Sequence, residues 1–168
     1  EEIYAAVTEF DACGGIEVTA SHNPIDYNGM KIVGRNSTPL SNQEFEAIKD
    51  LAEVSNFIQP TKKGAVLNKK EAARVAYVEK VLRFVDCKEL KPLKMVINSG
   101  NGAAGPTVDA INKKLKEKGV KTNFVFVHHD PDPTFPNGIP NPLLKENRSS
   151  TAKAVIEERA DFGVAFDG

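Results

Sequence analysis

The chain has 168 residues, of which 40% are hydrophobic and 27% are charged, with a formal net charge of −1. This size accommodates one domain or two small ones. No apolar run approaches membrane-spanning length, and basic residues do not cluster with aromatic ones, so membranes and nucleic acids are not expected partners. The N-terminus shows no signal peptide, and Cys13 and Cys87 lack metal or redox spacing, which favours a reducing, cytoplasmic setting.

Hydrophobic periodicity predicts alternating helices and strands. The expected helices span residues 3–10, 41–52, 68–85, 106–118 and 151–159, and the expected strands span residues 16–19, 30–33, 94–98, 122–127 and 162–166. Ser41 with Glu44 three residues later indicates a capping box, and Phe45, Ile48 and Leu51 are expected on the buried face of that helix. Strands separated by helices predict an α/β fold of two consecutive three-layer units with mixed, mainly parallel sheets.

A polar segment at residues 59–67 contains Pro60 and Gly64, which predicts a linker between two domains. We assign residues 1–66 to the first domain and residues 67–168 to the second. Because the chain has no initiating methionine, we expect it to be a piece of a longer protein in which both units are truncated. The first half is then expected to self-associate or to be disordered.

The stretch from Gly14 to Lys31 carries the strongest chemical signal in the sequence. A short apolar strand is followed by Ser21-His22-Asn23-Pro24, and Lys31 comes ten positions after the serine. Taken alone, the loop fits a structural turn and an exposed phosphate acceptor equally well, because Asn-Pro also initiates turns. A hydrolase is not favoured, because adjacent side chains on extended backbone point apart and no G-x-S-x-G elbow is present.

The whole string T-A-S-H-N-P-x-D-Y-N-G-x-K resembles the phosphoserine loop of the α-D-phosphohexomutases, most closely that of the bacterial phosphomannomutases. The resemblance continues through N-S-G-N-G-A-A-G-P, F-P-N-G-I-P-N-P-L and the final G-V-A-F-D-G, so it spans the chain. It implies interconversion of mannose 6-phosphate and mannose 1-phosphate through a hexose 1,6-bisphosphate. A phosphoglucomutase, or a mutase acting on both sugars, is the alternative. The implied partners are a phosphosugar and the rest of the parent enzyme, its third and fourth domains, so the chain alone is expected to be inactive.

The resemblance also implies roles for individual residues of this chain. Ser21 carries the phosphoryl group, His22 lies beside the group being transferred, and Lys31 is the candidate general acid/base near the sugar hydroxyl. Asn23 and Asn28 are candidate residues for binding phosphate or substrate.

Asp167 follows the last predicted strand, at the sheet edge where open α/β folds place their ligand loops. In the family this loop resembles D-G-D-x-D-R, whose three aspartates hold Mg²⁺ together with a phosphoserine oxygen. The magnesium ligands implied for this chain are therefore Asp167 and Ser21, the latter through its phosphate. Because one of the three carboxylates is present, weak Mg²⁺ binding is expected.

The run Gly100–Gly105 satisfies G-x-G-x-x-G between a predicted strand and a predicted helix, the context of dinucleotide-binding folds. Asp130 comes late for the expected ribose-binding carboxylate, and a tight, closely packed turn is the alternative that the mutase resemblance favours.

His128 and His129 face opposite ways on a strand, so at most one serves a given site. No chemistry is assigned to the proline-rich loop 130–141. A dinucleotide-binding enzyme and a non-catalytic interaction domain remain as rival classes.

Overall fold

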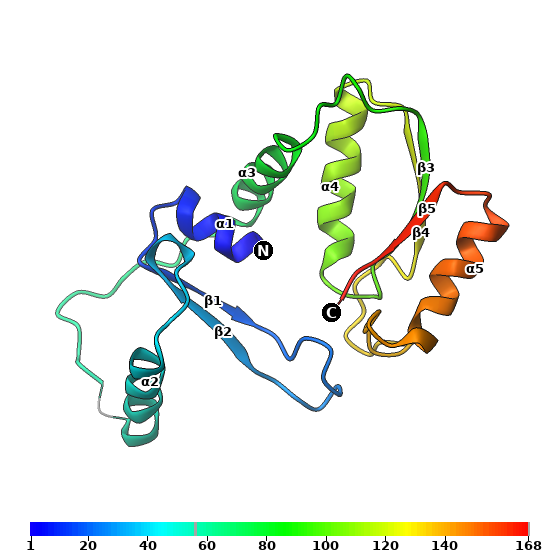
Figure 1. The fold of residues 1–168 in the computed structure, drawn as a ribbon. Coiled ribbons are helices and arrows are strands. Elements are labelled where there is room, and N and C mark those ends of the chain that lie inside the picture. Colours follow the sequence, from blue (N-terminus) through cyan, green and yellow to red (C-terminus); the bar gives the residue numbers. More distant parts are fainter. Residues whose placement is uncertain (56, 168) are drawn as a thin grey trace. The chain divides into compact units, whose positions relative to one another are not determined.

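A computed structural model describes residues 1–55 and 57–167 (Figure 1). Its elements in chain order are α1 (Glu2–Glu9), β1 (Gly14–Val18), β2 (Met30–Gly34), the 3₁₀ turn η1 (Arg35–Ser37), α2 (Asn42–Val54), α3 (Lys70–Leu82), β3 (Leu93–Asn98), α4 (Ala104–Glu117), β4 (Thr122–Val127), the 3₁₀ turn η2 (Lys145–Arg148), α5 (Ser149–Glu157) and β5 (Phe162–Ala165). The predicted helices and strands are confirmed, with ends that shift by at most three residues.

The chain divides into two compact units that do not follow the sequence order. Residues 1–17 and 30–77 form the first unit, and residues 18–29 join the described part of 78–168 in the second. The loop that carries Ser21 therefore groups with the second unit, although it connects two strands of the first. The domain boundary at residue 66 stays a prediction. Residues 57–69 around it form neither helix nor strand and are exposed.

In the first unit, α1 packs on the two-stranded sheet of β1 and β2. The side chains of Ile3 and Val7 lie directly over Gly15 of β1, and Val7 and Val33 are buried. An ion pair between Arg74 of α3 and Glu2, at 3.5 Å, connects α3 with the start of α1.

Helix α2 begins as predicted, but its apolar face is not buried. The Ser41 hydroxyl oxygen accepts a hydrogen bond from the N–H of Glu44, whose carboxylate accepts one from the N–H of Ser41. The prediction of a buried face is wrong, because Phe45, Ile48 and Leu51 are 51%, 41% and 50% exposed. Helical periodicity identifies an apolar face, but only a second packed element buries it. Within residues 1–55 and 57–167 that face stays about half exposed.

The second unit contains a parallel sheet with strand order β4-β3-β5. In Figure 1, α4 lies on one face of this sheet and α5 on the other, which confirms an α/β unit with a parallel sheet. The central strand β3 is the most buried: Val96 is fully buried and Ile97 is 5% exposed. Coverage on both faces explains why Met95, Val96 and Ile97 of β3 are consecutive apolar residues that do not alternate with polar ones.

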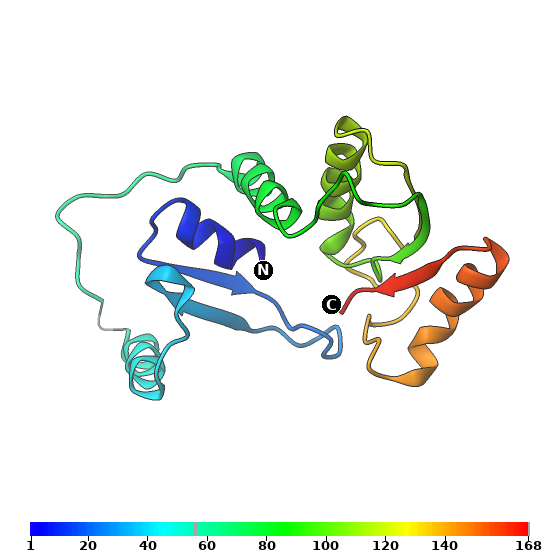
Figure 2. The same cartoon turned by 45° about the horizontal axis from the view of Figure 1, so that its top comes forward.

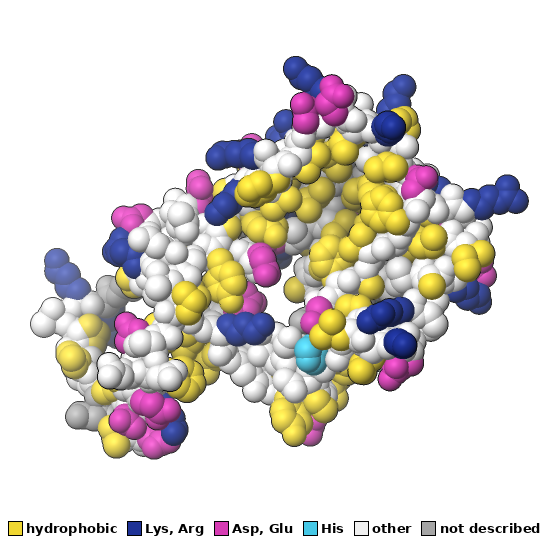
Figure 3. Space-filling view, viewed as in Figure 1, with side chains coloured by type: hydrophobic (Ala, Val, Ile, Leu, Met, Phe, Trp, Pro, Cys, Tyr) yellow, Lys and Arg dark blue, Asp and Glu magenta, His cyan; other side chains and the backbone are white. Residues whose placement is uncertain are grey.

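The hydrophobic cluster on the α4 side of the sheet joins two helices. It consists of Val78 and Leu82 of α3, Leu115 of α4, and Val120, with Phe124 of β4 packed against them. On the visible face of Figure 3, Lys and Arg side chains are interspersed with Asp and Glu. No helix within the described residues is long and apolar enough to cross a lipid bilayer.

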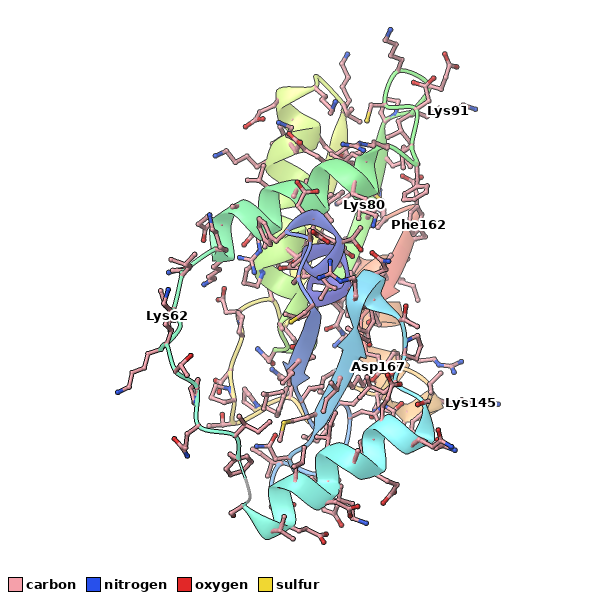
Figure 4. The ribbon with its side chains drawn as sticks, turned by 90° about the vertical axis from the view of Figure 1, so that its left-hand side faces the viewer. Lys62, Lys80, Lys91, Lys145, Phe162 and Asp167 are labelled. Atoms are coloured by element: carbon pink, nitrogen blue, oxygen red, sulfur yellow. The ribbon has the colours of Figure 1, made fainter. Side chains whose placement is uncertain are left out.

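Because β3, β4 and β5 are parallel, their carboxyl ends meet at one edge of the sheet, at Asn98, Val127 and Ala165. The Ser99 N–H donates to the Val127 carbonyl, and the Phe166 N–H donates to the Asn98 carbonyl, so the pairing continues one residue past β3 and past β5. Asp167 comes next, at the end of the described chain (Figure 4).

Candidate functional site

Ser21 lies in a tight loop with an uncommon backbone conformation. Its φ angle is 54°, in the left-handed region that a serine enters at some energetic cost. The N–H of Ser21 donates to the Thr19 hydroxyl at 2.8 Å, and the next turn closes where the N–H of Asn23 donates to the Ala20 carbonyl at 3.1 Å. Strained residues of this kind are concentrated at functional sites, where the surrounding bonds hold them in place.

His22 reaches across to the end of β5. Its Nδ1 lies 2.9 Å from Oδ1 and 3.2 Å from Oδ2 of Asp167. A carboxylate has only acceptors, so the hydrogen on Nδ1 is donated to it. Figure 2 shows the loop between β1 and β2 beside the chain end that follows β5. The serine loop and the predicted metal-loop aspartate, which the sequence places 145 residues apart, therefore meet in the second unit.

The other predicted site residues have local roles in the structure. The side chain of Asn23 donates to the Ala20 carbonyl at 2.8 Å, and the side-chain oxygen of Asn28 accepts from the Gly29 N–H at 2.8 Å. Both side chains thus shape the loop. Lys31 is exposed on β2, in the first unit. Their roles in binding or proton transfer stay predictions.

A complete magnesium site is not present in the described residues. Among positions 1–55 and 57–167, no group of three or more His, Cys, Asp or Glu side chains is arranged to hold a metal ion. The candidate site offers the single carboxylate of Asp167, and His22 bonds to it. A hard divalent cation prefers several oxygen ligands, so these residues by themselves do not fit Mg²⁺.

The glycine run after β3 is a packing feature. A Cβ on Gly105 would lie 2.2 Å from the carbonyl oxygen of His129, and one on Gly100, whose φ is +59°, would lie 2.3 Å from the Pro140 side chain. The space next to these two glycines is thus filled by the chain itself. This close approach explains the glycines without a pyrophosphate, and it supports the tight-turn interpretation.

His128 and His129 follow β4 rather than lying on it, so the expectation of opposite faces on a strand is wrong: His128 has a left-handed φ of 46° and lines a pocket, and His129 has other partners. His129 stacks on Phe126, with ring centroids 4.0 Å apart, and its Nε2 lies 2.9 Å from the Asp109 carboxylate. Its Nδ1 lies 3.3 Å from the hydroxyl of Ser99, which is 1% exposed. Because Ser99 is buried, this series of hydrogen-bonded Ser, His and Asp side chains does not present a nucleophile. It connects α4 to the sheet.

Asn98 is a residue that the sequence reasoning missed. Its side-chain amide donates to the Thr151 hydroxyl at 2.9 Å, and its side-chain oxygen accepts from the Gly100 N–H at 2.9 Å. Its backbone carbonyl binds the N–H of Phe166, next to Asp167. The available signal was a polar residue closing a buried apolar strand, where it is 6% exposed.

A pocket of about 200 Å³ opens at this edge of the sheet. Asn98, Ser150 and Phe166 line it together with residues 137–142 of the proline-rich loop. The loop to which no chemistry was assigned therefore helps to shape the carboxyl edge of the sheet.

Family models match most of the chain. The model described as phosphoglucomutase/phosphomannomutase, alpha/beta/alpha domain I, matches residues 1–59, and the model for alpha/beta/alpha domain II matches residues 75–168. The chain belongs to the phosphoglucomutase/phosphomannomutase family. The phosphoserine-loop resemblance of residues 14–31 thus lies in the part that matches domain I, and Asp167 in the part that matches domain II.

Individual members of the family align with the whole chain. A phosphomannomutase of Escherichia coli K12 is 50% identical over 171 residues, and one of Salmonella montevideo is 49% identical over 169 residues. A solved structure of a putative phosphomannomutase from Thermus thermophilus has a TM-score of 0.78 at 27% identity and matches 99% of this chain. The chain spans 37% of the length of each of these three proteins.

Proposed function

We propose that the complete protein containing this chain is a phosphomannomutase that works through a phosphoserine at Ser21. The observation that carries the proposal is the hydrogen bond from His22 to Asp167, which brings the family's serine loop beside its metal-loop aspartate. The matched relatives named phosphomannomutase support the substrate class.

The proposed reaction has two phosphoryl transfers. In the first, the bond between phosphorus and the Ser21 oxygen breaks and a bond forms to a free hydroxyl of the sugar monophosphate, whose proton passes to Lys31. The bisphosphate then turns around in the site, and its other phosphoryl group is transferred to the Ser21 oxygen, while Lys31 returns the proton to the sugar oxygen that this transfer frees. This step regenerates the phosphoserine and releases the isomeric monophosphate. Such transfers depend on placing the attacking and leaving oxygens in line and on neutralising the negative charge on the oxygens of the transferred group.

Charge explains why more than this chain is needed. A phosphoserine carries a charge of about −1.5 to −2 at neutral pH, and the Asp167 carboxylate adds another negative charge beside it. His22 donates one hydrogen bond there, which does not balance that charge. A divalent cation would balance this charge, but it needs more oxygen ligands than Asp167 and the phosphate provide. We therefore propose that further carboxylates of the complete protein join Asp167 and the phosphoserine around Mg²⁺, and that the chain 1–168 alone does not turn over substrate.

The test is peptide mapping by mass spectrometry of the complete protein isolated from its source. We expect phosphate on Ser21, and transfer of label to Ser21 from a hexose 1,6-bisphosphate. Ser21→Ala should abolish labelling. Ser55→Ala should not, although Ser55 shares the left-handed backbone, with a φ of 51°, and is more exposed than the half-buried Ser21. An unmodified Ser21 that also resists labelling would overturn the proposal and leave a non-catalytic domain as the better explanation.

Mannose specificity requires a separate measurement. A phosphoglucomutase and a mutase acting on both sugars share the serine chemistry, and the structural relative from Burkholderia thailandensis is named only as a phosphoglucomutase/phosphomannomutase family protein. We expect kcat/KM to be higher for mannose 1-phosphate than for glucose 1-phosphate in the complete protein. Equal values would assign a bifunctional enzyme without affecting the role of Ser21.

A further inference from the structure

We infer that His22 is a positioning residue that holds the serine loop onto the end of β5 through Asp167. The inference about the hydrogen bond rests on geometry alone, whereas its meaning for phosphoryl transfer rests on the proposed function. It assigns to His22 a task other than contact with the transferred group.

The first observation is the way the serine loop is built. Residues 18–29 group with the second unit, whereas the rest of β1 and all of β2, which flank them, group with the first. Its internal bonds are short-range: the Thr19 N–H donates to Gly29, the Asn23 N–H to Ala20 and the Tyr27 N–H to Pro24. These bonds define the shape of the loop but do not connect it to the sheet of the second unit.

The second observation is that the bond from His22 makes such a connection. The Nδ1 of His22 lies within 3.2 Å of both carboxylate oxygens of Asp167. Asp167 is in turn held in place by its neighbour, because the Phe166 N–H donates to the carbonyl of Asn98 in the buried central strand. The serine loop is therefore linked to the core of the sheet through two hydrogen bonds and the backbone between Asp167 and Phe166.

The two side chains retain substantial exposure, 38% for His22 and 44% for Asp167. Water competes for such a bond, so it orders the loop rather than stabilising the whole fold. Holding a reactive loop in one geometry before other groups arrive lowers the cost of positioning them later. A second His–Asp pair, His129 and Asp109, has the same 2.9 Å separation but lies between α4 and the end of β4, which makes it a matched control.

The experiment is amide hydrogen exchange on the complete, chelator-treated protein, read at the amides of Asn23 and Phe166. His22→Ala should accelerate exchange at these amides about three- to tenfold, the range expected when one hydrogen bond is lost. Asp167→Ala should have the same effect, and the double variant should add little more, because both changes remove one bond. His22→Asn retains an N–H donor near the position of Nδ1, and it should restore exchange to within about twofold of the wild type.

The controls distinguish positioning from general loosening. Asp109→Ala, which breaks the matched pair, should leave Asn23 unaffected. Unchanged exchange in His22→Ala, failure of His22→Asn to restore protection, or additive effects in the double variant would each overturn the inference. If a variant unfolds, the remaining variants still decide the result. A phosphorylated Ser21 with unchanged exchange would refute the positioning role alone, and restored protection by His22→Asn with an unphosphorylated Ser21 would refute the proposed function alone.

Discussion

Replacing Gly105 with alanine tests whether the glycine run is required for packing. The added Cβ would lie 2.2 Å from the His129 carbonyl oxygen, whereas ordinary contact begins at 3.4 Å, so backbone must move by 3.4 − 2.2 = 1.2 Å. Gly105 is buried near the start of α4, and the clashing atom is backbone rather than the end of a flexible side chain. Overpacking of this kind lowers the free energy of unfolding by about 3 kcal/mol.

A destabilisation of about 3 kcal/mol should lower the melting temperature of a unit of this size by on the order of 10–20 °C. Circular dichroism of the complete protein during heating measures the shift. The control is Gly119→Ala at the other end of α4, where φ is +75° and the space is open. That variant introduces backbone strain without a clash, and it should lower the free energy of unfolding by about 1 kcal/mol.

Two results would refute this reasoning. If Gly105→Ala melts within about 2 °C of the wild type, the glycine is not needed for the contact between α4 and the end of β4. If NAD raises the melting temperature of the wild-type protein, the run has the dinucleotide-binding role that the packing argues against. We expect neither.

Three further predictions concern other parts of the chain. Asn98→Leu leaves the Thr151 hydroxyl and the Gly100 N–H without their partner, which should cost about 1–3 kcal/mol, and an unchanged melting temperature would contradict the assigned bonds. The hydrogen bonds from Ser41 hold the pKa of Glu44 below its usual value, so the cap of α2 stabilises above the unfolded-state pKa of 4.5 and is lost as pH falls through the lower folded pKa. Helicity should therefore decrease as the pH is lowered through this range, and much less in Glu44→Gln; identical curves would argue against the cap. In the complete protein, Lys31→Gln should lower kcat about 100- to 10,000-fold and slow the labelling of Ser21 by a bisphosphate, because that transfer is the reverse of the first step; unchanged kcat would remove Lys31 as the acid/base.

Much of the local structure follows from the sequence, because it depends on near neighbours. The capping box of Ser41 and Glu44, the apolar run of β3 and the alternation of helix and strand each depend on residues a few positions apart. The serine loop was recognisable for the same reason, since its motif is contiguous.

Burial and contact between distant segments were decided by the tertiary structure. Phe45 and its neighbours have the spacing of a buried face, but spacing does not supply the element that covers it. The G-x-G-x-x-G run fits either a phosphate or a close backbone contact until the Gly105–His129 approach is known.

The bond between His22 and Asp167 is the clearest case. The sequence by itself determined which residues were candidates, because motif and strand end are local features. Only packing of β3 beside β5, which fixes the end of β5, and the grouping of residues 18–29 with that sheet bring the two side chains together across 145 residues. Sequence spacing carries no information on such a contact. The family resemblance implied that Ser21 and Asp167 share a magnesium ion, but the bond between His22 and Asp167 is visible only in the tertiary structure.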